Sequence, residues 1–367
     1  MRHMPGSVRD SIVEHLLASD VASLDDIHKA VVLRIGDVAQ SSIRSYLNLN
    51  TPEVFERSAR GQYRLRGQRP FESRSFDDQT LKVGRASLVH ADAFEWLRSR
   101  EPQTIHAVVT DPPYGLLEYT DAEQEKLRKG KGGVWRVPPS FDGHKRSPLP
   151  RFTVLNDGDH AAMQDFFFEL GRLLFRVTVP GANVIIASNP LLAHIVASAM
   201  SRAGLELRGS ITRLVMTMRG GDRPKNAHHE FSDVSVMPRS MYEPWVILRH
   251  PLEGRAQDNL RKWKTGGFRR ISDSKPFGDV IQSMPTSARE KRIAPHPSLK
   301  PQSFLRRLVR SSLPLGEGLI LDPFAGSGST LAAANAIGYE SLGVERDAAY
   351  YKLASNAIGK LAALAVE

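Results

Sequence analysis

The residues of this chain that stand out chemically form a short segment, Asp111-Pro112-Pro113-Tyr114. The segment follows Val108-Val109, the end of an apolar run that is typical of a buried parallel strand. Ligands of open α/β sheets bind at the carboxyl ends of such strands. A carboxylate, free backbone carbonyls and an aromatic ring together suit a flipped-out nucleobase whose amino group is modified. The same segment also fits an ordinary β-turn, because Asp and Pro favour turns.

A second segment, far downstream, combines a strand, a glycine-rich turn and the start of a helix. It covers residues 318–330 with the sequence GLILDPFAGSGST, and its glycines allow the backbone to approach a ligand closely. The helix is expected to begin at Ser329 or Thr330. A further strand, residues 341–344, is followed by Glu345, which stands where an acid binds a ribose in a βαβ nucleotide site. A plain glycine-rich turn would leave the position of this acid unexplained.

Together the two segments resemble those of the amino-group DNA methyltransferases, which use S-adenosylmethionine to methylate adenine N6 or cytosine N4. The resemblance implies that residues 111–114 are catalytic and that the Phe-x-Gly-x-Gly turn binds the cofactor. Residues 90–97 resemble the family segment whose acid lies near the adenosyl end of the cofactor. Residues 296–301 resemble the His-Pro-x-x-Lys-Pro segment beside its methionine part, with Ser298-Leu299 in place of the more usual Thr-Gln. The implied cofactor-binding residues are Asp92, Ala93, His296, Ser298, Lys300, Asp322, Phe324, Ala325, Gly326, Ser327, Gly328, Thr330, Glu345 and Arg346.

The order of the two segments is the reverse of that in a standard methyltransferase chain. This permuted order is similar to that of the β group of DNA amino-methyltransferases, and the resemblance covers approximately residues 77–362. It implies a Rossmann-like α/β fold with circularly permuted motifs, the catalytic half preceding the cofactor half. It weighs against RNA and protein methyltransferases with the same catalytic turn, because these keep the cofactor segment first.

The resemblance also implies a mechanism of direct in-line methyl transfer that needs no metal and yields S-adenosylhomocysteine. Asp111 and the carbonyl of Pro112 would accept hydrogen bonds from the amine, while Tyr114 would stack on the flipped base. In the family, Asp at the first motif position accompanies adenine N6 and Ser accompanies cytosine N4, so the prediction is an adenine-specific enzyme acting on duplex DNA. The alternatives are a cytosine-N4 enzyme, an RNA methyltransferase and a catalytically inactive DNA-binding regulator.

Composition limits the chemistry further. The chain of 367 residues has no cysteine, which excludes disulfides, thiolate metal sites and a cysteine nucleophile, and with it C5 methylation of cytosine through a covalent adduct. With 50 Lys and Arg against 40 Asp and Glu, the charge favours a polyanionic partner. No apolar run is long enough for a membrane span, and the expected location is the cytoplasm. The chain contains no Glu-x-Lys and therefore lacks the common Asp…Glu-x-Lys nuclease core, so a restriction endonuclease partner would be a separate protein. The sequence leaves open whether the protein forms a homodimer.

The first 70 residues are predicted to form a separate winged helix-turn-helix-like domain. Helical spacing places Ile12, Ile27 and Ile43 in three successive helices, the second of them capped by Ser23, and a hairpin turns at Arg60-Gly61. The third helix is the usual reader of the major groove in such domains. A small helical domain for protein contacts or dimerisation is the alternative. A linker over 71–80 precedes the methyltransferase domain, 81–367.

Two basic segments within the catalytic domain are candidate DNA contacts. Residues 116–152 are predicted to form a mobile basic loop beside the active site, or a solvated loop without a role. Residues 250–292 stand where the β group places its target-recognition region, with Trp263 and Phe268 between basic residues. The candidate DNA-binding residues are Arg44, Arg60, Lys129, Lys131, Arg261, Lys264, Arg269 and Arg270.

Overall fold

The computed structural model of the chain describes most of its residues. These are residues 7–19, 21–52, 54–66, 80–113, 140–141, 144–145, 157–215, 221, 223–224, 226–296 and 298–366. Most of the expected linker (71–80) and of the expected basic loop (116–152) lies outside them, as do Tyr114, Lys129 and Lys131.

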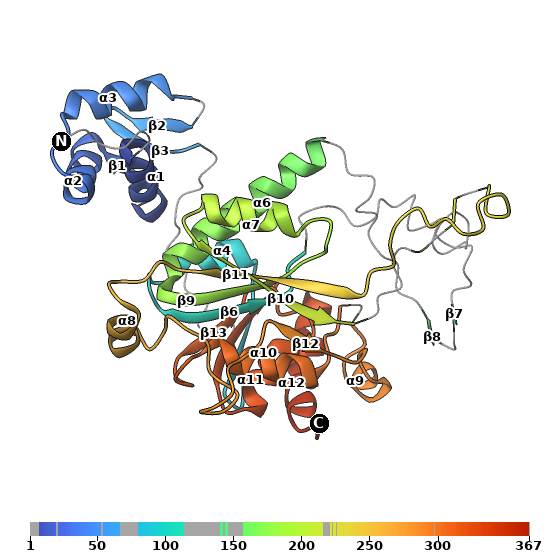
Figure 1. The fold of residues 1–367 in the computed structure, drawn as a ribbon. Helices are drawn as coiled ribbons and strands as arrows, with labels where there is room; N and C mark the ends of the chain where they lie inside the picture. Colours follow the sequence, from blue (N-terminus) through green and yellow to red (C-terminus); the bar gives the residue numbers. More distant parts are fainter. Residues whose placement is uncertain are drawn as a thin grey trace.

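A mixed sheet of nine strands forms the centre of the described chain (Figure 1). In chain order its strands are β4 (Thr80–Val83), β5 (Ala86–His90), β6 (Ile105–Thr110), β9 (Thr178–Ala187), β10 (Glu206–Leu214), β11 (Tyr242–Arg249), β12 (Val280–Gln282), β13 (Leu319–Asp322) and β14 (Glu340–Glu345). In space they follow the order β12-β10-β11-β9-β6-β13-β14-β5-β4. The five strands from β9 to β5 are parallel, whereas β11 and β4 run antiparallel to their neighbours. The predicted α/β class is therefore confirmed, as a large mixed sheet.

Helices cover both faces of this sheet (Figure 1). One face carries α4 (Ala93–Ser99), α6 (Asp157–Val177) and α7 (Ala193–Arg202), and the other carries α10 (Gln302–Ser312), α11 (Ser329–Ala336) and α12 (Ala348–Ala362). Two shorter helices, α8 (Ala256–Trp263) and α9 (Ala288–Ile293), lie at the rim, and β7 (Ser140–Phe141) pairs with β8 (His144–Lys145). No helix in the described part of the chain has the length and the apolar character needed to cross a membrane.

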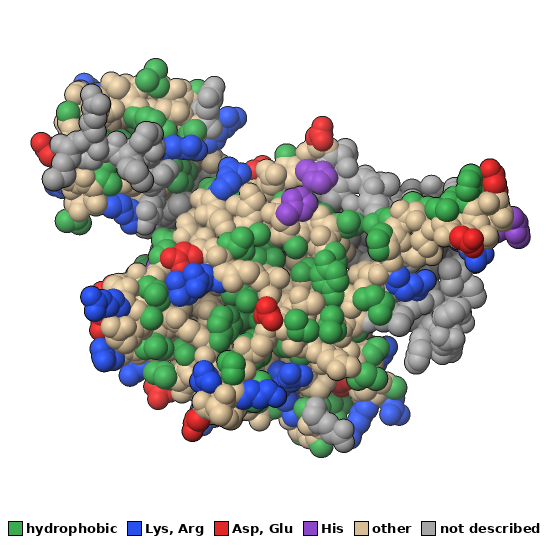
Figure 2. All heavy atoms as spheres, in the orientation of Figure 1, with side chains coloured by type: hydrophobic (Ala, Val, Ile, Leu, Met, Phe, Trp, Pro, Cys, Tyr) green, Lys and Arg blue, Asp and Glu red, His purple; other side chains and the backbone are tan. Residues whose placement is uncertain are grey.

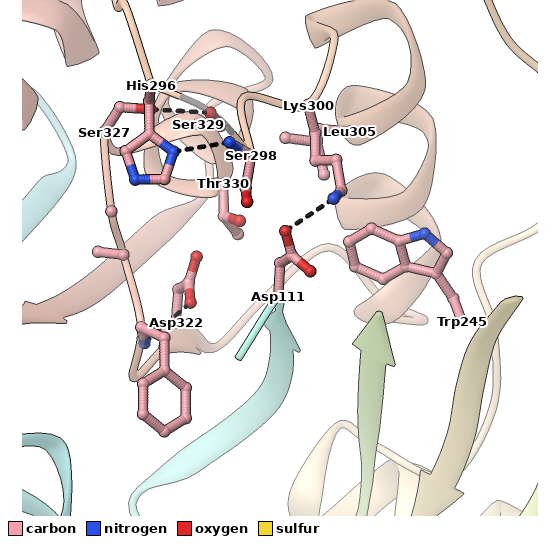
Figure 3. A pocket seen from close by; sticks show the side chains of 13 residues that line it. Asp111, Trp245, His296, Ser298, Lys300, Leu305, Asp322, Ser327, Ser329 and Thr330 are labelled. Atoms are coloured by element: carbon pink, nitrogen blue, oxygen red, sulfur yellow. Dashed lines mark hydrogen bonds and ion pairs between the residues drawn. The ribbon is translucent and has the colours of Figure 1, made fainter. Parts of the chain in front are cut away.

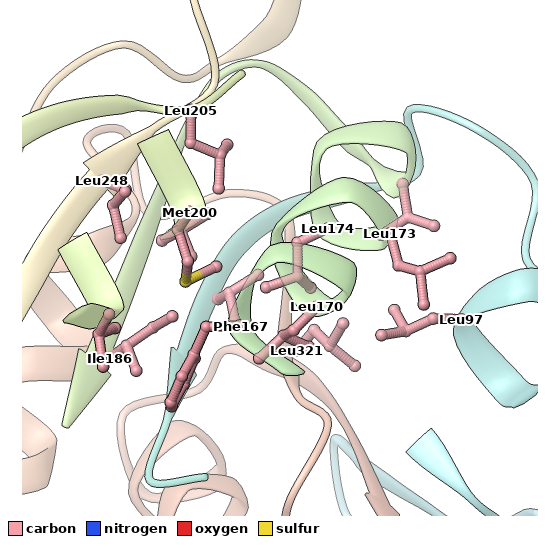
Figure 4. Close-up of a cluster of buried hydrophobic side chains, with 14 of the residues drawn as sticks. Leu97, Phe167, Leu170, Leu173, Leu174, Ile186, Met200, Leu205, Leu248 and Leu321 are labelled. Carbon is pink, nitrogen blue, oxygen red and sulfur yellow. The ribbon is translucent and has the colours of Figure 1, made fainter. Parts of the chain in front are cut away.

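The central strands are buried on both faces, which explains their nearly continuous apolar sequence. All ten residues of β9 are buried, and in β6 only His106 is partly exposed. Figure 4 shows Leu170 and Leu174 of α6 packed together with Ile186 of β9. Each fully buried side chain of this size contributes about 1.5–3 kcal/mol relative to an exposed one. This layer fixes the carboxyl ends of the strands, where the predicted site residues lie.

The small N-terminal unit contains the three helices and the hairpin that the sequence predicts. Its elements are α1 (Ser7–Ser19), β1 (Ala22–Ser23), α2 (Leu24–Ile35), α3 (Gln40–Leu49), β2 (Phe55–Ala59) and β3 (Gln62–Leu65). The hydroxyl of Ser23 caps α2 by accepting a hydrogen bond from the backbone N–H of Asp26 at 3.1 Å, as expected. The short strand β1, which pairs with β3, was not predicted. Phe168 of α6 packs against the core of this unit, so the unit contacts the larger domain through α1 and α6.

Candidate active site

A pocket lies at the carboxyl ends of β6 and β13, near the middle of the sheet (Figure 3). It is lined by Asp111, Trp245, His296, Ser298, Lys300, Leu305, Asp322, Phe324, Ala325, Gly326, Ser327, Ser329 and Thr330. Asp111 directly follows β6, and Asp322 is the last residue of the neighbouring strand β13. Thr110 joins the two strand ends, because its hydroxyl donates to Oδ1 of Asp322 at 2.7 Å. The fold therefore brings together the two segments that the sequence places about two hundred residues apart.

Lys300 forms an ion pair with Asp111 at the centre of the pocket. Its Nζ atom donates to Oδ2 of Asp111 at 2.7 Å and lies 3.1 Å from Oε1 of Glu243. Burial raises the pKa of Asp111, and the negative charge of Glu243 raises it further, while Lys300 acts in the opposite direction. Burial would lower the pKa of Lys300, but the two carboxylates outweigh it and the pKa is raised. Figure 3 shows the ammonium group turned towards Asp111.

Glu243 and Arg213 continue this charged network, and sequence reasoning missed both. Nη1 of Arg213 donates to Oε2 of Glu243 at 2.7 Å, and its Nε donates to the hydroxyl of Ser283 at 3.0 Å. The guanidinium also lies over the ring of Phe304, 5.0 Å from its centre. Burial opposes ionisation of Glu243, but Lys300 and Arg213 hold its pKa below the usual value. The only signal for Glu243 in the sequence is its place just before the apolar run 245–248. Its position beside the pocket depends on the antiparallel direction of β11.

The glycine-rich turn after β13 approaches the pocket with its backbone. Gly326 has φ +52°, and a Cβ atom there would lie 3.2 Å from the imidazole of His296. The backbone N–H of Gly326 donates to Oε2 of Glu345 at 2.8 Å, and that of Asp347 donates to Oε1 at 2.7 Å. The acid at the end of β14 is thus held against the turn. The turn that lines the pocket, the acid Glu345 beside it and the acid Asp322 within it form a set of groups that fits the ribose and the cationic part of S-adenosylmethionine.

Two ionisable groups of the pocket have strongly shifted pKa values. Burial raises the pKa of Asp322 to about 6, against the effect of hydrogen bonds from Thr110 and Thr330. Burial, with Lys300 nearby, lowers the pKa of His296 to about 4, so this imidazole is neutral at pH 7. The neutral ring uses Nδ1 to accept a hydrogen bond from the backbone N–H of Ser298 at 3.2 Å.

The remaining predicted cofactor residues lie beside the pocket. Asp92 caps α4 through a hydrogen bond from the N–H of Phe94 to its Oδ1 at 2.9 Å, and the exposed Arg346 lies 3.7 Å from its Oδ2. Ala93 follows in the first turn of α4 and is buried. Gly328 caps α11 and turns towards α12, where a Cβ atom would lie 2.5 Å from Ile358. In the predicted catalytic segment, Pro112 is buried and Pro113 is exposed.

The candidate DNA-binding residues of the segment 250–292 lie far from the pocket. The side chain of Asn259 in α8 donates to the carbonyl of Pro180, near the start of β9, so α8 lies at the amino ends of the parallel strands. Arg269 bonds the hydroxyl of Tyr339, which precedes β14, at the same edge. Figure 2 shows Lys and Arg side chains around α8 beside acidic ones, and Arg261 pairs with Asp258 at 2.9 Å.

Part of the predicted target-recognition segment 250–292 therefore lies away from the pocket, at the amino ends of the parallel strands. Arg261, Lys264, Arg269 and Arg270 belong to the part that lies at the amino ends of the strands. The segment returns to the pocket side only around Ser283, because it crosses the sheet edge as β12. In the N-terminal unit, Arg44 and Arg60 are exposed.

Comparison with known proteins identifies the family. The N6/N4 methyltransferase family model, described as DNA methylase, matches residues 105–356. The chain belongs to this DNA methylase family. The protein is thus an S-adenosylmethionine-dependent DNA methyltransferase, and DNA is its substrate.

Similar proteins include two type II methyltransferases. The methyltransferase is similar to the type II methyltransferase M2.DpnII of Streptococcus pneumoniae, with 24% identity over 275 residues, 73% of this chain and 87% of that protein. It is also similar to the type II methyltransferase M.HindIII of Haemophilus influenzae, with 22% identity over 298 residues, 74% of this chain and 94% of the other. A solved structure, that of the putative DNA modification methylase TTHA0409 from Thermus thermophilus complexed with S-adenosyl-L-methionine, has 22% identity and a TM-score of 0.46, covering 77% and 95% of the two chains.

Proposed function

We propose that this methyltransferase transfers the methyl group to N6 of adenine in duplex DNA, on a base flipped into the site at residues 111–114. The observation that carries the proposal is Asp111, whose carboxylate stands at the carboxyl end of β6 in the pocket. The family pattern in which Asp accompanies adenine and Ser accompanies cytosine N4 supports adenine as the target.

The chemistry follows from the weak nucleophilicity of the adenine amine, whose lone pair is conjugated with the ring. Asp111 and the carbonyl of Pro112 accept hydrogen bonds from the two amine hydrogens, which turns the lone pair out of the ring plane. Tyr114 stacks on the extruded base and offsets part of the cost of flipping, by about 1–3 kcal/mol. A fixed orientation in a site closed to water provides the remaining acceleration.

S-adenosylmethionine, when bound, supplies an electrophilic methyl group on its sulfonium. We assign the ribose of the cofactor to Glu345 and its cationic methionine part to the side of the pocket where Asp322 lies. The backbone of Gly326 allows the cofactor to come close to the turn. We assign six further pocket residues to the same cofactor site: Phe324, Ala325, Ser327, Thr330, His296 and Ser298. Gly328 starts the helix that follows the turn. Asp92, Ala93 and Arg346 are assigned to the adenosyl end of the cofactor. The arrangement of Gly326 against Glu345 supports this assignment.

We also propose that the motifs are circularly permuted as in the β group, and that the first 70 residues form a winged helix-turn-helix domain that reads DNA. The late position of β13 in the chain beside the early strand β6 supports the permutation. Three helices with a hairpin, and the exposed Arg44 on α3, support the DNA-reading role. The type II relatives support a role beside a separate restriction endonuclease.

Transfer of a labelled methyl group from S-adenosylmethionine tests the proposed substrate. Duplex DNA and structured RNA are offered in competition to the wild-type protein and to Asp111→Ala. We expect label in duplex DNA with the wild type only. Label that accumulates in RNA, or undiminished transfer by the variant, would refute the assignment.

A further inference from the structure

Four charged side chains of alternating sign form a continuous chain that begins at the catalytic acid. It runs from Asp111 through Lys300 and Glu243 to Arg213, with contacts of 2.7, 3.1 and 2.7 Å. The four come from separate parts of the fold: the end of β6, the segment before α10, and the strands β11 and β10. Their side chains are 24, 16, 17 and 7% exposed in that order, so solvent screens these contacts little.

The backbone on both sides of Lys300 is fixed. The carbonyl of Leu299 accepts a hydrogen bond from the hydroxyl of Thr286 at 2.6 Å, and the N–H of Gln302 donates to Oε1 of Glu290 at 2.7 Å. Glu290 itself belongs to the capping box of α9. Lys300 therefore projects from a rigid segment, and its ammonium is held at Asp111 by the fold.

The pairing leaves the two oxygens of Asp111 in different situations. Lys300 occupies Oδ2, whereas no described residue donates a hydrogen bond to Oδ1. A carboxylate that must accept a hydrogen bond from an amine needs one free, ionised oxygen in a fixed direction. Without the ammonium, Asp111 would face Glu243 across the site, with Asp322 of β13 also nearby, and like charges favour protonation.

We propose that Lys300 is a positioning residue for Asp111, which it holds by Oδ2 so that Oδ1 alone is presented to the amine of the target base, and that Glu243 and Arg213 hold Lys300 in place. The proposal deepens the proposed function and rests on it. It differs from the role expected from the sequence, in which Lys300 stands beside the methionine part of the cofactor.

Two substitutions with opposite electrostatic effects provide the test. Lys300→Met removes the positive charge next to Asp111, and Glu243→Gln removes the negative one while Lys300 remains. Single-turnover methyl transfer is measured against pH at saturating S-adenosylmethionine, and cofactor affinity is measured by calorimetry. Lys360→Met, at an exposed lysine in the last turn of α12, is the control.

We expect Lys300→Met to slow the methyl step at pH 7 at least about 100-fold and to move the acid limb of the pH profile to higher pH. We expect Glu243→Gln to move that limb to lower pH, because Glu243 opposes ionisation of Asp111. Lys300→Arg restores part of the rate, and cofactor affinity changes less than about twofold in each variant. General structural damage would not shift the two acid limbs in opposite directions.

The proposal is overturned if Lys300→Met weakens cofactor binding while the rate at saturation and the pH profile stay unchanged. It is also overturned if the acid limbs of both variants move in the same direction. A wild-type product other than methyladenine would refute the proposed base alone, because the shift of the acid limb can be measured on any methylated product.

Discussion

Nζ of Lys300 lies 2.7 Å from Oδ2 of Asp111, although 189 residues separate the two in the chain. The contact exists because β6 ends at the same edge of the sheet to which the segment before α10 returns. The contact joins the predicted catalytic turn to a lysine that the family resemblance places beside the cofactor. The position of a side chain within the site therefore had to come from the fold.

Asp111→Asn is expected to reduce methyl transfer at least about 100-fold, because the amide presents a weaker, uncharged acceptor to the amine. Binding of S-adenosylmethionine, measured by calorimetry, should remain within a few-fold of the wild type. Asp165→Asn, on the exposed side of α6, is the matched control and should leave the rate unchanged. A variant at 111 that turned over normally would exclude this acid from the reaction.

Asp322 should make cofactor binding depend on pH. Burial raises its pKa to about 6, and the cationic cofactor favours the ionised acid. Affinity should thus increase as the pH rises from about 5 to 7, and the dependence should be reduced in Asp322→Asn. Calorimetric titrations at several pH values check this, and an equally steep dependence in the variant would contradict it.

The same acid should affect the stability of the free protein with a definite sign. Because its folded pKa of about 6 lies above the unfolded value of 3.8, the folded state binds the proton more tightly, and stability from this group is lost as the pH rises from about 4 to 6. Asp322→Asn should therefore match the wild type below pH 4 and exceed it by up to about 3 kcal/mol at pH 7. Denaturant unfolding at both pH values measures the difference, and a variant less stable at pH 7 would contradict it.

Gly328→Ala should destabilise the protein by about 2–5 kcal/mol, since it adds backbone strain at φ +80° to a Cβ atom 2.5 Å from Ile358. Gly338→Ala is the control, because Gly338 has φ +79° with open space around it. Strain alone should cost about 1–2 kcal/mol there. Chemical denaturation measures the free energy of unfolding of both variants. Equal losses in the two would show that the packing of α11 on α12 is not tight at this point.

Arg44→Ala should weaken binding to duplex DNA if α3 contacts the double helix. A lost phosphate contact would reduce the slope of log affinity against log salt by about 1, and a lost base contact would cost about 1–3 kcal/mol on the target sequence only. Titrations at several salt concentrations distinguish the two. Unchanged affinity on all sequences would favour the alternative role of the N-terminal unit in protein contacts.

Much of the fold was predictable because its elements have strong local signals. Residues 318–330 and Glu345 lie in the predicted strand, turn and βαβ unit, with α11 beginning at Ser329. The end of α6 carries no such signal: the helix spans Asp157–Val177, β9 begins directly after it at Thr178, and the turn signal Pro180-Gly181 lies inside the strand.

The charged network could not be predicted because it depends on strand direction. Glu243 lies beside the pocket because β11 runs antiparallel to β9. This direction places the start of β11 at the carboxyl ends of the parallel strands. The same reversal carries α8 to the opposite edge, with Arg261 and Lys264. Many basic residues make a segment a candidate DNA contact, but they do not indicate at which edge of the sheet the segment lies.

The proposed target of the site at Asp111 is N6 of adenine. Duplex DNA of mixed sequence, treated with the wild-type protein and S-adenosylmethionine, is digested to nucleosides and separated by mass. We expect N6-methyldeoxyadenosine, reduced at least about 100-fold in the Asp111→Asn reaction. N4-methyldeoxycytidine in its place would contradict the proposal.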